Sequence, residues 1–172
     1  MARKSLVSKA LLVGSFFLIS FLALPMKVLE ARAMNPFSQV KPPNADWKLR
    51  KVSDTEIEVF LKSQPKTVNL GLKIMDGVPV GSQNFLDQVR SKGMEDPDTK
   101  GAEFGLVRSQ EVGGKTWDYF ILKRKDEIDQ EFWTRKISAD EVLMVLYTAV
   151  GAYYDQYHPE FLKVLEQAAK GD

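Results

Sequence analysis

Side chains able to carry out acid–base or metal chemistry are scarce in this sequence. His158 is the single histidine, and there is no cysteine among the 172 residues. A thiolate nucleophile, a disulfide and a metal site built from several imidazoles of one chain are therefore excluded. His158 precedes Pro159 and has no nucleophile beside it in the sequence, so we interpret it as a capping or surface histidine. We expect no catalytic residue, no metal ligand set and no cofactor.

Acidic residues form two short clusters that could in principle bind a cation or supply a catalytic carboxylate pair. Neither cluster has the ligand spacing of an EF-hand. The second cluster also follows a basic run, which would partly neutralise a cation site. We therefore interpret both clusters as solvated turn charge. Their members are Glu95, Asp96 and Asp98 in the first, and Asp126, Glu127, Asp129 and Glu131 in the second.

Aromatic residues concentrate in the second half of the chain. Most of them are interpreted as packing in the core or on a sheet face. Tyr153, Tyr154 and Tyr157 lie close together before the expected last helix, and three neighbouring tyrosines can line a cleft. Because Trp and Tyr are enriched at interfaces, these three residues and Trp133 are our candidate binding residues.

The first 33 residues have the features of a secretory signal peptide. A basic start precedes an apolar run over 10–25, and a small-x-small sequence ends at Ala33. We expect cleavage after Ala33, and the alternative is an uncleaved N-terminal anchor. Without this segment the chain is mildly acidic, and no clustered basic surface indicates a nucleic-acid partner. Residues 34–45 contain three prolines and are expected to form an extended leader.

Residues 55–63 and 67–74 alternate apolar and polar side chains, which predicts two strands. A helix is predicted over 82–93. Gly113-Gly114 joins two strand-like runs, 102–112 and 115–125, and a Gly-Gly pair is a strong hairpin signal. A final helix is predicted over 159–170, with Pro159 in its first turn and Gly171 after its end.

The stretch 131–151, EFWTRKISADEVLMVLYTAVG, admits two structures. Ser138 and Glu141 fit a capping box, and the apolar residues after them share one helical face. The same residues are rich in β-branched side chains and tyrosine, which favours a strand pairing locally with residues 131–137. Ala139-Asp140 lacks the Gly or Asn that a tight hairpin prefers. Local patterns leave the two readings nearly even.

The order of these elements, with VLMVLYTA (142–149) and YDQYHPEFLKVLEQA (154–168), resembles the PsbP/DcrB-like superfamily. The resemblance covers most of residues 46–170 and favours the hairpin. It implies one α+β domain over 46–172, with a single antiparallel sheet of about six to seven strands flanked by two helices.

The resemblance also implies a non-enzymatic accessory or binding protein. Together with the signal peptide it predicts a periplasmic or otherwise extracytoplasmic protein with a protein partner in the cell envelope. The alternative function is a periplasmic hydrolase that depends on carboxylates or a metal.

Overall fold

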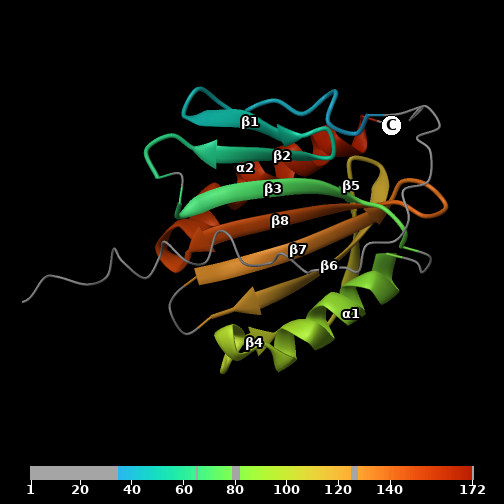
Figure 1. Ribbon diagram of the computed structural model, residues 1–172. Coiled ribbons are helices and arrows are strands. Elements are labelled where there is room, and N and C mark those ends of the chain that lie inside the picture. The colour runs from blue at the N-terminus through green and yellow to red at the C-terminus, as the bar shows by residue number, and fades with distance from the viewer. Residues whose placement is uncertain (1–34, 65, 79–81, 125–127, 172) are drawn as a thin grey trace, which may run out of the picture. The chain divides into compact units, whose positions relative to one another are not determined.

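The computed structural model describes residues 35–64, 66–78, 82–124 and 128–171. One antiparallel sheet, two α helices and a short 3-10 helix are the regular elements of this part of the chain (Figure 1). The chain divides into residues 1–34 and a second unit from residue 35 onward. The expected signal peptide, anchor and cleavage site lie outside the described residues. The strands are β1 (Trp47–Ser53), β2 (Glu56–Leu61), β3 (Val68–Met75), β4 (Glu103–Phe104), β5 (Arg108–Val112), β6 (Lys115–Lys123), β7 (Ile128–Lys136) and β8 (Val142–Val150). The helices are α1 (Ser82–Glu95), the short 3-10 helix η1 (Pro97–Thr99) and α2 (Gly151–Ala169).

The strand order is β1-β2-β3-β8-β7-β6-β4, and β5 also pairs with β6. Every pairing is antiparallel. The predicted α+β class with a single antiparallel sheet is therefore confirmed. The sheet has eight strands, because the run predicted as one strand over 102–112 is divided into β4 and β5, and because β1 was not predicted.

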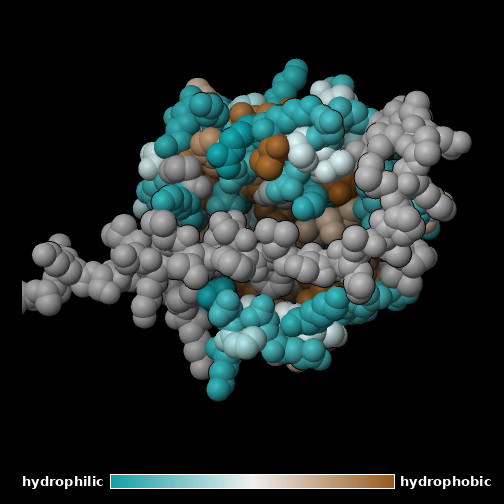
Figure 2. All heavy atoms as spheres, in the orientation of Figure 1, coloured by the Kyte–Doolittle hydropathy of each residue, from teal (hydrophilic) through white to brown (hydrophobic). Residues whose placement is uncertain are grey.

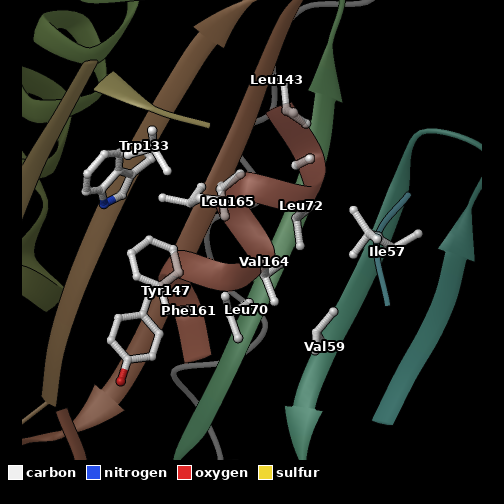
Figure 3. Close-up of a cluster of buried hydrophobic side chains, with 14 of the residues drawn as sticks. Ile57, Val59, Leu70, Leu72, Trp133, Leu143, Tyr147, Phe161, Val164 and Leu165 are labelled. Carbon is white, nitrogen blue, oxygen red and sulfur yellow. The ribbon is translucent and has the colours of Figure 1, made fainter. Parts of the chain in front are cut away.

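The two α helices lie on opposite faces of the sheet (Figure 1). The predicted alternation holds in β2 and β3, where every second side chain is buried toward α2. Figure 3 shows this core, in which Leu70, Val164 and Leu165 lie between the sheet and the helix. A smaller core on the other face joins Phe85, Leu86 and Val89 of α1 to apolar residues of β6 and β7.

The ambiguous stretch 131–151 is a hairpin of β7 and β8. Ser138 does not begin a helix: its Oγ accepts the N–H of Glu141 at 3.2 Å and so closes the turn. β8 lies between β3 and β7 and is paired along its length with both. This long-range pairing selects the strand where local propensity was nearly balanced.

The last helix begins eight residues earlier than predicted. Pro159 lies inside α2, and Tyr153, Tyr154 and Tyr157 belong to the helix instead of preceding it. The hairpin predicted at Gly113-Gly114 is confirmed, and both residues have positive φ, 62° and 75°.

Residues 35–45 were expected to be an extended leader, yet their described structure is folded onto the domain. Val40 is buried in the core on the α2 face, and Phe37 packs against it. The N–H of Lys41 donates to Oε1 of Gln167 in α2 at 2.7 Å. The prolines suggested an open spacer, but a hydrogen-bonded turn and the buried side chain of Val40 hold residues 35–45 against the domain.

Charged side chains occupy both edges of the described sheet. β1 is the outermost strand on one side, and Lys48, Arg50 and Lys51 on it are exposed. On the other side, Nε of Arg90 in α1 donates to the carbonyl of Gly105, next to β4, at 2.7 Å. Figure 2 shows a largely hydrophilic surface over β1, β2 and α1, with hydrophobic side chains between them. Among the described residues, no helix combines the length and the apolar character needed to span a bilayer.

Candidate functional site

Three side chains donate hydrogen bonds to one buried carboxylate, that of Glu131. Its Oε2 accepts Nε1–H of Trp133 at 2.6 Å. Its Oε1 accepts the hydroxyl of Tyr154 and lies 3.0 Å from Nε2 of His158. The Glu131 side chain is only 2% exposed, whereas that of His158 is 32% exposed. Glu131, which we interpreted as solvated turn charge, is therefore buried. We call Glu131, Trp133, Tyr154 and His158 the Glu131 cluster.

The strand pairing places Glu131 under α2. Glu131 lies opposite Ile121 of β6 and Tyr147 of β8. Side chains alternate along a strand, so Glu131 faces the same side as Trp133, which packs against α2. The Trp133 ring is stacked on Tyr119 at 4.3 Å between centroids, which fixes the indole N–H toward the carboxylate.

Helical spacing supplies the other two donors. Tyr154 and His158 are four residues apart in α2, so both project from the same side of the helix. The hydroxyl of Tyr147 donates to the carbonyl of Tyr154 at 3.0 Å, and the Tyr147 ring stacks on Phe161 at 4.8 Å. Figure 3 shows Trp133, Tyr147 and Phe161 together at one side of the core.

The electrostatics of the cluster favour a charged pair. Burial pushes the pKa of Glu131 upward, but hydrogen bonds from His158, Tyr154 and Trp133 outweigh burial and leave this pKa below its ordinary value. The hydrogen bond to Glu131 raises the pKa of His158, against the opposing effect of burial. Burial, followed by the nearby Glu131, raises the pKa values of Tyr147 and Tyr154, so both remain protonated.

Both oxygens of Glu131 already accept protein donors. Asp118 is also buried, but it lies opposite Thr134, three positions from Glu131 along β7, and so faces the α1 side. No two buried carboxylates face each other in the described part of the chain, and no metal-binding group of three side chains occurs there.

Two surface hollows have linings that do not include the Glu131 cluster itself. One, of about 320 Å³, is lined by residues of β4, the segment after it, β5 and β6. Its lining includes Tyr119 and Ile121, which lie opposite Trp133 and Glu131 in the sheet. The other, of about 480 Å³, lies around η1. Neither hollow is lined by Glu131 or His158.

The four candidate binding residues lie near the same end of α2, but they differ in exposure and in the contacts that they make. Trp133 is 2% exposed and lies beneath the helix. Tyr154 is half-buried, with its hydroxyl directed to Glu131. Tyr153 and Tyr157 are half-buried with ring centroids 6.1 Å apart, and Tyr153 Oη accepts Nε2–H of Gln64 at 3.0 Å.

Sequence reasoning missed the partnership of Glu131 and His158. The signal was available in the alternation of β7, since a buried Trp133 places Glu131 two residues earlier on the same face. The spacing of Tyr154 and His158 was a second signal, which was hidden while the helix was expected to start at Pro159.

Neither a protein-family model nor a curated protein matches this sequence. The chain is similar in structure to cyanobacterial PsbP (CyanoP) from Synechocystis sp. PCC 6803, whose solution structure is known. The TM-score is 0.50 at 10% sequence identity, and the alignment covers 72% of this chain and 81% of that protein. The chain therefore has a PsbP-like fold, as the resemblance in sequence order predicted.

Proposed function

We propose that this protein is a non-enzymatic, extracytoplasmic accessory protein that binds a protein partner in the cell envelope. The supporting observation is the pair of Glu131 and His158, the one buried acid–histidine pair among the described residues, which joins α2 to the sheet. A general base needs a reacting group within hydrogen-bond reach, and neither Glu131 nor His158 lines either of the two hollows described above. The PsbP-like fold agrees with this proposal, because the resemblance implies assembly and docking roles.

The first turns of α2 are the proposed binding surface. Tyr153 and Tyr157 present half-buried rings there, and rigid aromatic rings bury large areas at a low cost in conformational entropy. Trp47 holds the Tyr157 ring from below in an edge-to-face contact at 5.8 Å. Tyr154 and Trp133 contribute indirectly, because their polar atoms bind Glu131 and so position the helix.

Photocrosslinking tests this surface in the full chain. A photoreactive phenylalanine analogue at position 157 is expected to crosslink to a discrete envelope protein. The same analogue at Glu95, exposed at the end of α1 on the other face of the sheet, is the matched control. Affinity for the purified partner should fall at least about tenfold when Tyr153 and Tyr157 are both replaced by Ala, which corresponds to one strong contact.

Two results would contradict the proposal. One is identical crosslinking from positions 157 and 95. The other is unchanged affinity of the double alanine variant. Cell fractionation and N-terminal sequencing test the location separately, since export with cleavage after Ala33 yields a chain that starts at Met34.

A carboxylate-dependent hydrolase is the second candidate, and the Glu131–His158 pair is the observation that favours it. This function requires turnover of an ester, phosphate or glycoside by the purified protein, and loss of that turnover in His158→Gln. Turnover that persists unchanged in His158→Gln would assign the activity to another site or to a contaminant.

A further inference from the structure

The first half of α2, residues 151–158, is poorly suited to be a helix on its own. Its sequence, GAYYDQYH, contains a glycine, three tyrosines, an aspartate and a histidine, all of which have lower helix propensity than alanine. The residue before it, Val150, makes no side-chain capping hydrogen bond. Contacts with the rest of the protein must therefore hold this half in helical form.

Those contacts differ between the two halves of α2. The second half is anchored by five buried residues, Phe161, Val164, Leu165, Ala168 and Ala169. Every residue of the first half is at least partly exposed. Its contacts are tyrosine rings at the edge of the core and hydrogen bonds to polar partners, and the cluster around Glu131 is the most deeply buried of these.

Pro159 stands at the boundary of the two halves. It has no N–H, so the carbonyl of Asp155 lacks its usual helical donor, and the proline ring crowds the same carbonyl. A helix interrupted in this way bends most easily at that point. Opening of the first half therefore need not disturb the second.

We propose that the first half of α2 is a pH-controlled latch, closed by protonated His158 on Glu131 and opening about Pro159 when His158 loses its proton. The latch is a conformational device that does not depend on the proposed docking function. Deprotonation leaves the buried Glu131 carboxylate without a positively charged donor, and charge-assisted hydrogen bonds are about twice as strong as neutral ones. The buried carboxylate is then better solvated in the open state.

The titratable groups around His158 agree with this direction. Glu131 faces it from β7, Tyr147 from β8, and Tyr154 and Asp155 from α2 itself. The two carboxylates favour protonated His158. The two tyrosines stay neutral, because burial raises their pKa values. His158 is therefore the group that changes charge between weakly acid and weakly alkaline pH.

Hydrogen exchange of the full chain tests the latch. Amide exchange of residues 151–158 is compared with that of residues 160–169 at about pH 6 and at about pH 8.5, two values that lie on either side of histidine titration. The measured rates are corrected for the intrinsic exchange rates at each pH. Protection of the first half should fall at least about tenfold at the higher pH, as expected for loss of a charge-assisted bond. Protection of the second half should stay constant.

Variants separate the latch from general destabilisation. His158→Gln should show an open first half at both pH values, while Lys163→Gln, which removes an exposed charge from the second half, should behave like the wild type. Pro159→Ala should slow opening, because it restores the missing helical hydrogen bond. The proposal is overturned if both halves lose protection together, if the pH effect survives in His158→Gln, or if Pro159→Ala accelerates opening of the first half alone.

Discussion

Replacing Glu131 by Gln tests whether the buried carboxylate stabilises the fold. Gln has nearly the same shape, so it introduces no cavity. It replaces one acceptor oxygen by an N–H₂ donor and removes the negative charge. With three donors directed at the carboxylate, at least one of the N–H or O–H groups of Trp133, Tyr154 and His158 then meets another donor.

The expected loss is about 3 kcal/mol in the free energy of unfolding. Breaking a buried charge pair by changing one partner costs roughly 3–5 kcal/mol, and a buried donor without an acceptor costs about 1–3 kcal/mol. Partial exposure of His158 places the value at the lower end of the first range. A domain of this size is stable by about 5–15 kcal/mol, so the variant should fold with a clearly lowered midpoint.

Equilibrium urea unfolding, followed by the fluorescence of the buried tryptophans, measures this change. Glu166→Gln is the matched control, because Glu166 is exposed on α2 and its change should alter stability by less than about 0.5 kcal/mol. A double-mutant cycle of Glu131→Gln and His158→Gln should give a coupling of at least about 1 kcal/mol. A loss below about 1 kcal/mol, or additive effects of the two changes, would refute the reasoning.

The pH dependence of stability follows from the two pKa shifts. The pKa of His158 is raised in the folded state, so its stabilisation is complete below about pH 6.5, its unfolded value, and is lost as pH rises through the folded value. The pKa of Glu131 is lowered, so its stabilisation is present above about pH 4.3 and is lost as pH falls through its folded value. Stability should therefore be highest between these limits, and the alkaline decline should be absent in His158→Gln.

Three further predictions concern packing, and the same urea unfolding measures each of them. Gly113→Ala should be more destabilising than Gly114→Ala by about 1 kcal/mol. A Cβ at 113 would lie 2.9 Å from a side-chain carbon of α2, whereas a Cβ at 114 meets nothing within 4 Å. Equal losses of stability would mean that backbone strain alone determines the effect. Leu165→Ala should cost about 3 kcal/mol through the cavity it leaves, while Lys163→Ala on the exposed side should cost less than about 0.5 kcal/mol. Val40→Ala should cost about 1.5 kcal/mol if residues 35–45 are part of the core, and a neutral result would contradict that packing.

The sequence predicted correctly those elements whose apolar residues fit either a strand or a helix, but not both. The alternation in β2 and β3 was sufficient because each strand buries one face, and Gly113-Gly114 identified its hairpin because positive φ is required there. β8 could not be assigned from local pattern, since its structure is decided by pairing with β3 across some 70 residues of sequence. The resemblance in element order supplied that missing long-range information.

Two residues of the Glu131 cluster, Trp133 and Tyr154, were among the candidate binding residues predicted from the sequence. The other two were not, because Glu131 was interpreted as part of a charged turn and His158 as a capping or surface histidine. Burial of a carboxylate is favourable only when donors converge on it from other elements, and such convergence is a property of the tertiary structure. The leader was misread for a similar reason, because the contact of Val40 with the core is invisible in a proline-rich local sequence.

The charged edges of the sheet have a consequence for the protein at high concentration. If β1 of two copies paired antiparallel, the cations Lys48, Arg50 and Lys51 of each copy would face those of the other across the new ladder. At the opposite edge, Arg90 already occupies the carbonyl of Gly105 that an incoming strand would need. β1 and the end of β4 therefore oppose open-ended strand addition, which helps to protect a small, disulfide-free domain from aggregating through its own sheet.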